Sequence, residues 1–239
     1  MKNQLLSTSI KNFLKGRKTS QPIMATIDSV IKQELTYLNR DALLDLASVI
    51  INNRKNKIDG VIVETGCALG GSAIIIASSK SKSQKFFIFD VFGIIPQPSA
   101  KDEQDVHERY ETIISGNSKG IGKSKYYGYE EDLYGKVVNN FLSYGLDLEQ
   151  NHIYLVTGLY EKSLFIDHPV SLAHIDCDWY DSVYTCLSRI EPHLVSGGTL
   201  VIDDYYVWTG CRRAVDEYFE NIKAGYDFYH KSRLHIVKK

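Results

Sequence analysis

Two pairs of aspartates are the residues of this sequence best suited to chemistry. Asp176 and Asp178 stand at the end of one apolar run, in HIDCDWYDS, and Asp203 and Asp204 stand at the end of the next, in LVIDDYY. If the two runs are neighbouring parallel strands, all four carboxylates meet at the edge of the sheet where α/β proteins bind their ligands. Four close anions repel one another unless some are protonated or a cation lies among them.

The ligand chemistry of these pairs indicates which cation they would hold. Carboxylate oxygens without a His or Cys partner favour Mg²⁺, Mn²⁺ or Ca²⁺ over zinc. The two pairs therefore predict a divalent-metal site. The competing interpretation is N-capping of the following helices, by Asp178 or Asp181 and by Asp203 or Asp204. A helix needs only one capping side chain, whereas each of these strands is followed by two aspartates. Capping alone therefore does not explain both pairs.

A glycine-rich turn supplies a second candidate binding element. In VIVETGCALGGS an apolar run ends at Glu64, and three glycines follow before a run of small residues: Gly66, Gly70 and Gly71. Glycine permits positive φ angles and leaves space for a ligand beside the backbone. The spacing is not G-x-G-x-x-G, and Ser72 stands where a P-loop has its lysine. A nucleoside without a phosphate at this turn is the better match, and a purely structural tight turn is the alternative.

Asp90 ends another apolar run, FFIFD, downstream of the glycine turn. An acid at this place in an α/β sheet is positioned to accept hydrogen bonds from ribose hydroxyls. A surface aspartate that caps the next element is an equally good reading of Asp90 alone. Together with Glu64 and the glycines, Asp90 predicts an adenosine-type ligand.

The elements that must position these residues can be read from the hydrophobic pattern. Nearly continuous apolar runs indicate parallel strands covered on both faces, over 61–63, 86–90, 152–156, 171–176 and 199–204. Apolar residues at helical spacing separate them, over 42–50, 72–79, 183–194 and 214–222. Alternation of strand and helix predicts an α/β fold with a doubly wound, mostly parallel sheet, which the segments 227–230 and 234–238 would close as a hairpin. Asn39 and Asp181 are the expected N-caps of the helices over 42–50 and 183–194.

The length of 239 residues suits one domain, which we expect to span 1–239. Its first part, 1–55, is expected to be a helical segment, with Gly16 and Pro22 as breaks in the pattern.

The stretch 96–150 is too long for a simple crossover between two strands. It contains expected helices near 102–115 and 131–144, joined by a segment rich in Gly, Lys and Tyr. We interpret it as an insertion that is either a lid over the binding site or an oligomer contact. Tyr126, Tyr127 and Tyr129 in this insertion either stack on a ligand or belong to an exposed loop.

Composition excludes several classes of protein. With 28 basic and 29 acidic residues the net charge is −1, whereas nucleic-acid binders carry a basic excess and membrane-surface binders a polybasic patch. No apolar run is long enough for a signal peptide or a membrane span. The four cysteines form no C-x-x-C pair, which argues against zinc and disulfides and favours a cytoplasmic protein.

Three segments resemble the macrocin O-methyltransferase-like family of class I S-adenosylmethionine-dependent methyltransferases: ETGCALGGS, HIDCDWYDS and LVIDDYYVWTGCRRAVDEYF. The resemblance runs from about Thr36 to the C-terminus and is densest over 171–220. It implies a Rossmann-like class I methyltransferase fold. It also implies methylation of sugar hydroxyls in macrolide or aminocoumarin biosynthesis, and assembly into dimers or larger homo-oligomers.

The resemblance also implies roles for individual residues. Asp176, Asp203 and Asp204 match the ligands of a divalent metal, usually Mg²⁺, and Asp178 matches the acid that takes the proton from the sugar hydroxyl. The positions implied to contact S-adenosyl-L-methionine are Glu64, Thr65, Gly66, Gly70, Ser72, Asp90, Gly158, Leu159 and Asp176. One departure concerns the molecule that accepts the methyl group: VFGIIPQPS stands where an acidic D-S-F-E-G-L-P-like sequence is common.

These observations lead to one hypothesis and several alternatives. We expect a metal-assisted O-methyltransferase that aligns a hydroxyl of a small sugar-containing or natural-product acceptor with the methyl donor, with Asp178 as general base. A catechol-like diol is the alternative acceptor. A metal-dependent hydrolase and a non-catalytic interaction protein are alternatives of other classes. His174 is expected to be a satisfied strand residue, and Arg212 and Arg213 to form ion pairs.

Overall fold

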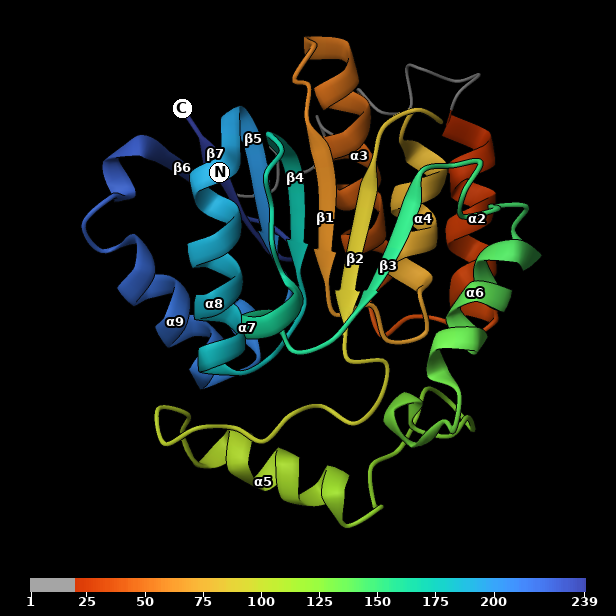
Figure 1. The fold of residues 1–239 in the computed structure, drawn as a ribbon, viewed down its shortest axis with the longest axis vertical. Helices are drawn as coiled ribbons and strands as arrows, with labels where there is room; N and C mark the ends of the chain where they lie inside the picture. Colours follow the sequence, from red (N-terminus) through yellow and green to blue (C-terminus); the bar gives the residue numbers. More distant parts are fainter. Residues whose placement is uncertain (1–19) are drawn as a thin grey trace, which may run out of the picture.

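The computed structural model describes residues 20–239, which form an α/β domain around one sheet (Figure 1). Seven strands lie in the order β3-β2-β1-β4-β5-β7-β6. The strands are β1 (Val61–Thr65), β2 (Phe86–Asp90), β3 (Ile153–Thr157), β4 (Val170–Ile175), β5 (Leu194–Ile202), β6 (Tyr226–His230) and β7 (Leu234–Lys238). The first five are parallel, and β7 pairs antiparallel with both β5 and β6. The doubly wound, mostly parallel sheet and the closing hairpin are confirmed.

Helices cover both faces of the sheet because the strand side chains alternate between two cores. Ile62, Leu172 and Val201 belong to one core and Val63 and Ala173 to the other. The helices are α2 (Ser20–Lys32), α3 (Arg40–Asn56), α4 (Gly71–Ser79), α5 (Gln104–Ile114), α6 (Leu133–Ser143), α7 (Tyr160–Ser163), α8 (Tyr180–Ile190) and α9 (Thr209–Phe219). Helices α2, α3, α4 and α6 contribute to the first core, and α8 and α9 to the second.

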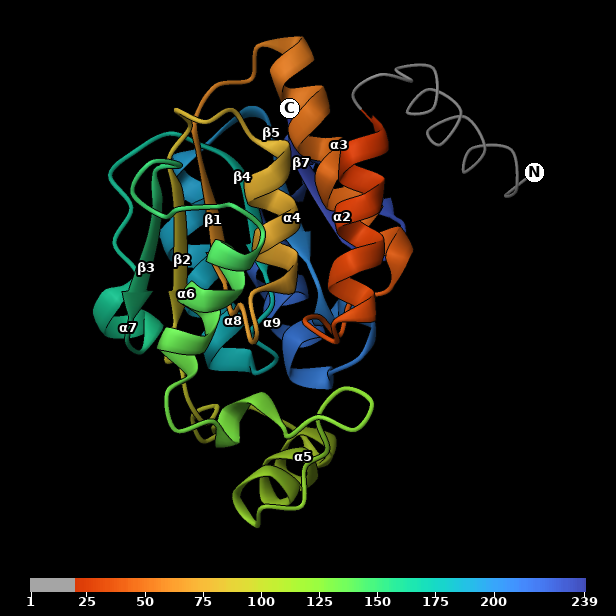
Figure 2. The same ribbon diagram turned by 90° about the vertical axis from the view of Figure 1, so that its right-hand side faces the viewer.

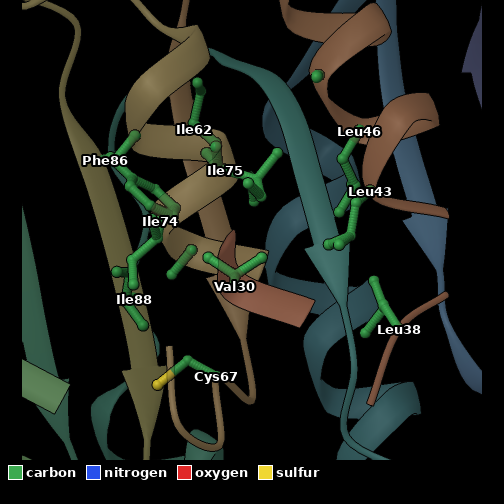
Figure 3. Close-up of a cluster of buried hydrophobic side chains, with 14 of the residues drawn as sticks. Val30, Leu38, Leu43, Leu46, Ile62, Cys67, Ile74, Ile75, Phe86 and Ile88 are labelled. Atoms are coloured by element: carbon green, nitrogen blue, oxygen red, sulfur yellow. The ribbon is translucent and has the colours of Figure 1, made fainter. Parts of the chain in front are cut away.

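The first core packs the N-terminal helices against the sheet. Figure 2 shows α2, α3 and α4 together on one side of the strands. In Figure 3, Ile75 of α4 lies next to Ile62 of β1, and Leu43 of α3 belongs to the same cluster; all three side chains are at most 1% exposed. The chain between 20 and 55 is therefore part of the main core. None of the helices in the described residues is long and apolar enough to cross a membrane.

Three local expectations can be checked against the helix ends. Asn39 caps α3 by accepting a hydrogen bond from the Ala42 amide at 2.9 Å, so that prediction is confirmed. The break expected at Pro22 is wrong, because α2 runs through it: proline fits the first turn of a helix, where its missing N–H has no partner to lose. Gly16 lies outside the described residues.

The expected cap at Asp181 is also wrong. Helix α8 begins one residue earlier, at Tyr180, and Asp181 instead pairs with Lys101 at 3.1 Å. The helix ends at Ile190, and Leu194, expected to continue it, is the first residue of β5.

The long insertion divides into two parts with different positions. Helix α6 packs Val137 and Phe141 into the first core and is the crossover helix between β2 and β3. Helix α5 instead lies beyond the carboxyl ends of the parallel strands, at the bottom of Figure 1. The extra length of 96–150 is thus used to cover the edge of the sheet that was predicted to bind ligands.

Glu191 is a buried carboxylate that joins the end of α8 to the C-terminal hairpin. It accepts hydrogen bonds from the hydroxyls of Tyr226 and Tyr218 and from the Lys238 ammonium. Burial would raise the pKa of Glu191, but these donors outweigh burial and lower the pKa below its usual value of 4.5. The ionised form is therefore the one that stabilises the fold.

Glu191→Gln is expected to lower the free energy of unfolding at pH 7 by about 1–2 kcal/mol, because hydrogen bonds to a charged group are weakened. A lowered pKa stabilises the native state above the unfolded pKa, so the wild-type advantage should shrink as the pH falls below about 4.5. Urea unfolding of both proteins at several pH values measures this. The exposed Glu220→Gln is the matched control, and a wild-type advantage independent of pH would contradict the prediction.

Candidate active site

The ends of β1, β4 and β5 are joined by backbone hydrogen bonds just beyond the strands. The Asp176 amide donates to the Thr65 carbonyl at 2.9 Å, and the Asp203 amide donates to the Ile175 carbonyl at 2.9 Å. These bonds place both aspartates at the same edge of the sheet. The predicted convergence of the two acidic pairs depends on β4 and β5 being neighbours, and they are.

The carboxylates at this edge are close enough to alter one another's protonation. Burial, together with the charges of Asp203 and Asp178, holds the pKa of Asp176 well above its usual range. Burial and the neighbouring aspartates also raise the pKa of Asp204, whose Oδ2 is buried without a hydrogen-bond partner. Holding all of these carboxyls ionised at once would therefore require an additional positive charge, as expected of a cation site.

Asp203 differs from the other three because positive groups hold it. Arg233, at the start of the β6–β7 hairpin's second strand, donates to Asp203 Oδ1 at 2.6 Å, and His174 Nε2 lies 3.5 Å from the same oxygen. Both lower the pKa of Asp203 against the effect of burial. His174 in turn contacts Glu64 Oε1 through Nδ1 at 2.8 Å. A row of alternating charge thus runs from Glu64 of β1 and His174 of β4 to Asp203 and Arg233, next to β5 and β7.

His174 is the centre of this row. Burial alone would lower its pKa, but the carboxylates of Asp203 and Glu64 outweigh burial and raise the pKa to about 9. His174 is therefore protonated near neutral pH, with Nδ1 bound to Glu64 and Nε2 near Asp203 but without a hydrogen-bond partner. The expectation of a satisfied strand residue thus holds for Nδ1 and not for Nε2.

The glycine turn lies beside Asp176. Gly66 has a φ of 82°, and a Cβ at this position would lie 1.8 Å from the Asp176 carbonyl oxygen. Only glycine fits so close to another backbone. Gly70, with a φ of 86°, is the N-cap of α4, and Ser72 is buried in its first turn. The turn therefore brings β1 and the loop after β4 into direct contact.

Asp90 has a structural role in the same turn. Its Oδ2 accepts a hydrogen bond from the Cys67 amide at 2.8 Å, and its Oδ1 accepts one from the Phe92 amide at 2.7 Å. The alternative of a surface aspartate that caps the next element is therefore wrong, because Asp90 is buried and joins the loops after β1 and β2. Each carboxylate oxygen can accept a second hydrogen bond, so this role leaves acceptor capacity for a ligand.

One cleft unites several of the predicted site residues. Gly66, Asp90, Leu159, Asp176 and Asp178 all line it, together with Tyr127 and Pro96 of the insertion. Glu64 and Thr65 are fully buried and do not line the cleft. Gly70, Ser72, Gly158, Asp203 and Asp204 are also outside its lining.

Strained backbone marks the loops of this edge. Ala68, Phe92 and Asp178 have φ angles of 46°, 49° and 60° in the loops after β1, β2 and β4. Non-glycine residues in this region cost free energy and concentrate at functional sites. Asp178 combines this conformation with a pKa that burial raises to about 6, against hydrogen bonds from Asp204 and Trp208.

The insertion is fixed to the site by two acids that sequence reasoning did not single out. Asp102 Oδ1 accepts a hydrogen bond from the Tyr180 amide at the start of α8 at 2.8 Å. Asp105 Oδ2 accepts one from the Thr209 amide at the start of α9 at 3.1 Å. The helix caps expected from acids that follow the strands are thus supplied by the insertion, which leaves Asp178, Asp203 and Asp204 available for a ligand.

The two tryptophans also lie at the site, and neither was predicted to. Trp179 donates from Nε1 to the Pro96 carbonyl at 2.9 Å, and its ring meets that of Trp208 edge to face with centroids 5.9 Å apart. Because they are the only tryptophans of the chain, tryptophan fluorescence reports on this cleft.

The sheet order, the glycine turn after β1 and the cleft at the carboxyl ends together define a class I methyltransferase fold. The chain belongs to the macrocin-O-methyltransferase (TylF) family, whose sequence profile matches residues 26–228. This confirms the resemblance inferred from the motifs.

Similar proteins support the assignment. The chain is 25% identical over 173 residues to demethyldecarbamoylnovobiocin O-methyltransferase of Streptomyces niveus, covering 68% of this chain and 59% of that one. It is 23% identical over 194 residues to mycinamicin III 3''-O-methyltransferase of Micromonospora griseorubida, covering 77% and 69%. The chain thus spans about three fifths of the length of the first relative.

Solved structures share the fold. The O-methyltransferase NovP superposes with a TM-score of 0.70 at 21% identity, covering 86% of this chain and 82% of that one. The calicheamicin methyltransferase CalS11 gives a TM-score of 0.56 at 14% identity, covering 92% and 93%.

Arg233→Gln is expected to lower the free energy of unfolding by about 3 kcal/mol, because it removes one partner of a largely buried ion pair. The negative charge of Asp203 would then have only His174 as a positive neighbour. Arg213 forms an exposed pair with Glu217 at 2.7 Å, so Arg213→Gln should cost less than about 1 kcal/mol. Denaturant unfolding of both variants measures the difference. Equal effects would show that the Asp203–Arg233 contact does not stabilise this edge.

Proposed function

We propose that this protein transfers a methyl group from S-adenosyl-L-methionine to a hydroxyl of a small sugar-containing or natural-product acceptor, with help from a divalent cation. The observation that carries the proposal is the cleft in which the Gly66 turn, Asp90, Asp176 and Asp178 meet, in a chain of the macrocin-O-methyltransferase family. Relatives named as O-methyltransferases of demethyldecarbamoylnovobiocin and mycinamicin III support the acceptor class.

The residues around the turn fit the cofactor. Gly66 keeps the backbone open, and Glu64 Oε2 and Thr65 Oγ1 are buried polar atoms without a hydrogen-bond partner. We propose that the cofactor is held by the residues implied by the family motif: Glu64, Thr65, Gly66, Gly70, Ser72, Asp90, Gly158, Leu159 and Asp176. When bound, S-adenosyl-L-methionine supplies a methyl group activated by a sulfonium.

The carboxylates fit a hard divalent cation such as Mg²⁺. Ligand atoms of Asp176, Asp203 and His174 lie within 4.8 Å of one another, and Asp204 contributes an unpartnered oxygen. His174 is already held by Glu64 through Nδ1 at 2.8 Å and is not among the ligands that the family motif implies. We therefore propose Asp176, Asp203 and Asp204 as the metal ligands. A bound cation would lower the pKa of an acceptor hydroxyl.

Asp178 is the proposed general base. Its backbone has the left-handed conformation, which Asp176 does not share. Its pKa of about 6 lies near the working range of an acid–base group. It would accept the proton of the hydroxyl as the oxygen attacks the methyl carbon. The remaining residues of the cleft orient the two reactants and exclude water.

We further propose that 1–239 works as a single methyltransferase domain, with 1–55 as its N-terminal helical segment and 96–150 as the lid over the acceptor. Helix α5 lies across the carboxyl edge of the sheet (Figure 1), and the caps that Asp102 and Asp105 provide hold it there.

Binding of the cofactor separates methyltransferases from the other classes. Wild-type protein is expected to bind S-adenosylhomocysteine in calorimetry, and Asp178→Asn should bind it equally while turnover falls at least 100-fold, because general-base catalysis contributes about 10²–10⁴. Asp181→Asn is the matched control and should leave turnover unchanged. No binding by the wild type would refute the proposed function, and normal turnover of Asp178→Asn would remove Asp178 as the base.

The metal role is tested by direct binding. Mg²⁺ should bind the protein in calorimetry and change the fluorescence of Trp179 and Trp208, and Asp204→Asn should weaken binding about tenfold or more. Methylation should stop after exhaustive treatment with EDTA and return when Mg²⁺ is added. Full turnover without metal would contradict the assignment.

A further inference from the structure

We infer that this protein has a second binding site, at the amino edge of its sheet, and that this site takes an apolar α-amino acid. The site is a cavity of about 260 Å³ at the start of the strands, whose other end forms the catalytic cleft (Figure 1). No residue of 20–239 lines both the cavity and the cleft, and the five residues of β1 between them span about 16 Å. The inference does not depend on the proposed function.

Four segments far apart in the chain enclose this amino-edge cavity. They are the end of α3, the loop before β1, the loop before β2 and the start of β4. Part of the lining is apolar and consists of Ile50, Ile58, Ile62 and Leu172. Because an apolar cavity of about 150 Å³ binds benzene, the amino-edge cavity has room for a ligand of roughly ten non-hydrogen atoms. The carbon atoms of such a ligand gain free energy when they leave water for these side chains.

Two amide side chains add unused hydrogen-bond acceptors to the lining. Asn53 is only 6% exposed; its Nδ2 donates to the Ser171 carbonyl at 2.9 Å, and no residue of 20–239 donates to its Oδ1. Gln84 donates from Nε2 to the Gly60 carbonyl at 2.8 Å and to Ser171 Oγ at 3.3 Å, and its Oε1 likewise accepts nothing from the described chain. These bonds fix both amides with an oxygen left over. A buried acceptor without a partner costs free energy, which a donor on a ligand would recover.

The lining carries one charge of each sign, from Arg54 and Asp59. Neither side chain forms an ion pair with any residue that the structure describes, including the other. A guanidinium binds a carboxylate through two parallel hydrogen bonds, and an ammonium supplies three donors. A ligand that is itself a zwitterion therefore matches this pair of charges better than a simple anion or cation.

An apolar α-amino acid combines the three features that the lining calls for. Its carboxylate would bind Arg54, and its ammonium would donate to Asn53 Oδ1 and to the Asp59 carboxylate. Its side chain would lie against the isoleucines. Leucine, methionine and phenylalanine have about the size that the cavity volume allows.

The walls of the cavity are held in place by contacts within the protein. Gly60 has a φ of 152°, and a Cβ on it would lie 2.8 Å from both the Pro169 carbonyl oxygen and the Ser171 amide nitrogen. The loop therefore packs its backbone directly on the start of β4. At the other end of the loop, the Ile58 amide donates to the Asn53 carbonyl at 2.9 Å. A site that is preformed in this way binds its ligand without a cost for ordering the loop.

Calorimetry with matched probes tests the inference. Wild type is expected to bind at least one of leucine, methionine and phenylalanine at concentrations up to about 10 mM, and that amino acid should raise the thermal unfolding temperature. For leucine, the reference probes are leucinamide, which lacks the carboxylate, 4-methylpentanoate, which lacks the ammonium, and glycine, which lacks the side chain. Each should bind about tenfold more weakly or worse, because each loses one of the three contacts.

Two variants assign the contacts within the cavity. Arg54→Gln should weaken leucine about tenfold or more and leave leucinamide unchanged, and Asp59→Asn should weaken leucine and leave 4-methylpentanoate unchanged. Both residues are exposed, so the variants are expected to fold. Lys55→Gln, an exposed change on the same helix outside the lining, is the control.

The location of the bound amino acid is tested by competition. Saturation with S-adenosylhomocysteine should leave the affinity for leucine unchanged, because the two sites share no residue. Competition between the two ligands would place the amino acid in the catalytic cleft and overturn the inference. Failure of the wild type to bind any of the three amino acids, or unchanged binding in both Arg54→Gln and Asp59→Asn, would overturn it as well. Failure to bind S-adenosylhomocysteine would count against the proposed function alone.

Discussion

Repulsion among the carboxylates at one edge of the sheet is the constraint on which the rest of the structure depends. Asp176, Asp178 and Asp204 stand close together with little positive charge between them, and burial increases the free energy of holding them ionised. The fold tolerates this because His174 and Arg233 neutralise Asp203. His174 of β4 and Arg233, which directly precedes β7, thus maintain an acidic edge that can still receive a third cation.

The insertion also supplies the N-terminal caps of two helices at the same edge. Helices α8 and α9 begin there, and their free amides would ordinarily take the nearest acids as caps. Asp102 and Asp105 of the insertion fill that role. The insertion is consequently fixed to the carboxyl edge of the sheet by the same hydrogen bonds that leave the strand-end aspartates free of helix capping. Fold stability and site composition are linked through these two caps.

Sequence by itself determined the sheet, the glycine turn and the acidic pairs, because hydrophobic periodicity and short motifs are local signals. It also identified Asn39 as a cap, since that hydrogen bond closes within three residues. Only the tertiary structure decided which acids cap α8 and α9, and that Arg233 and His174 hold Asp203. These contacts join residues 29 to 104 positions apart, and no local pattern encodes such pairs. The charge of each carboxylate in the site is therefore a property of the folded chain.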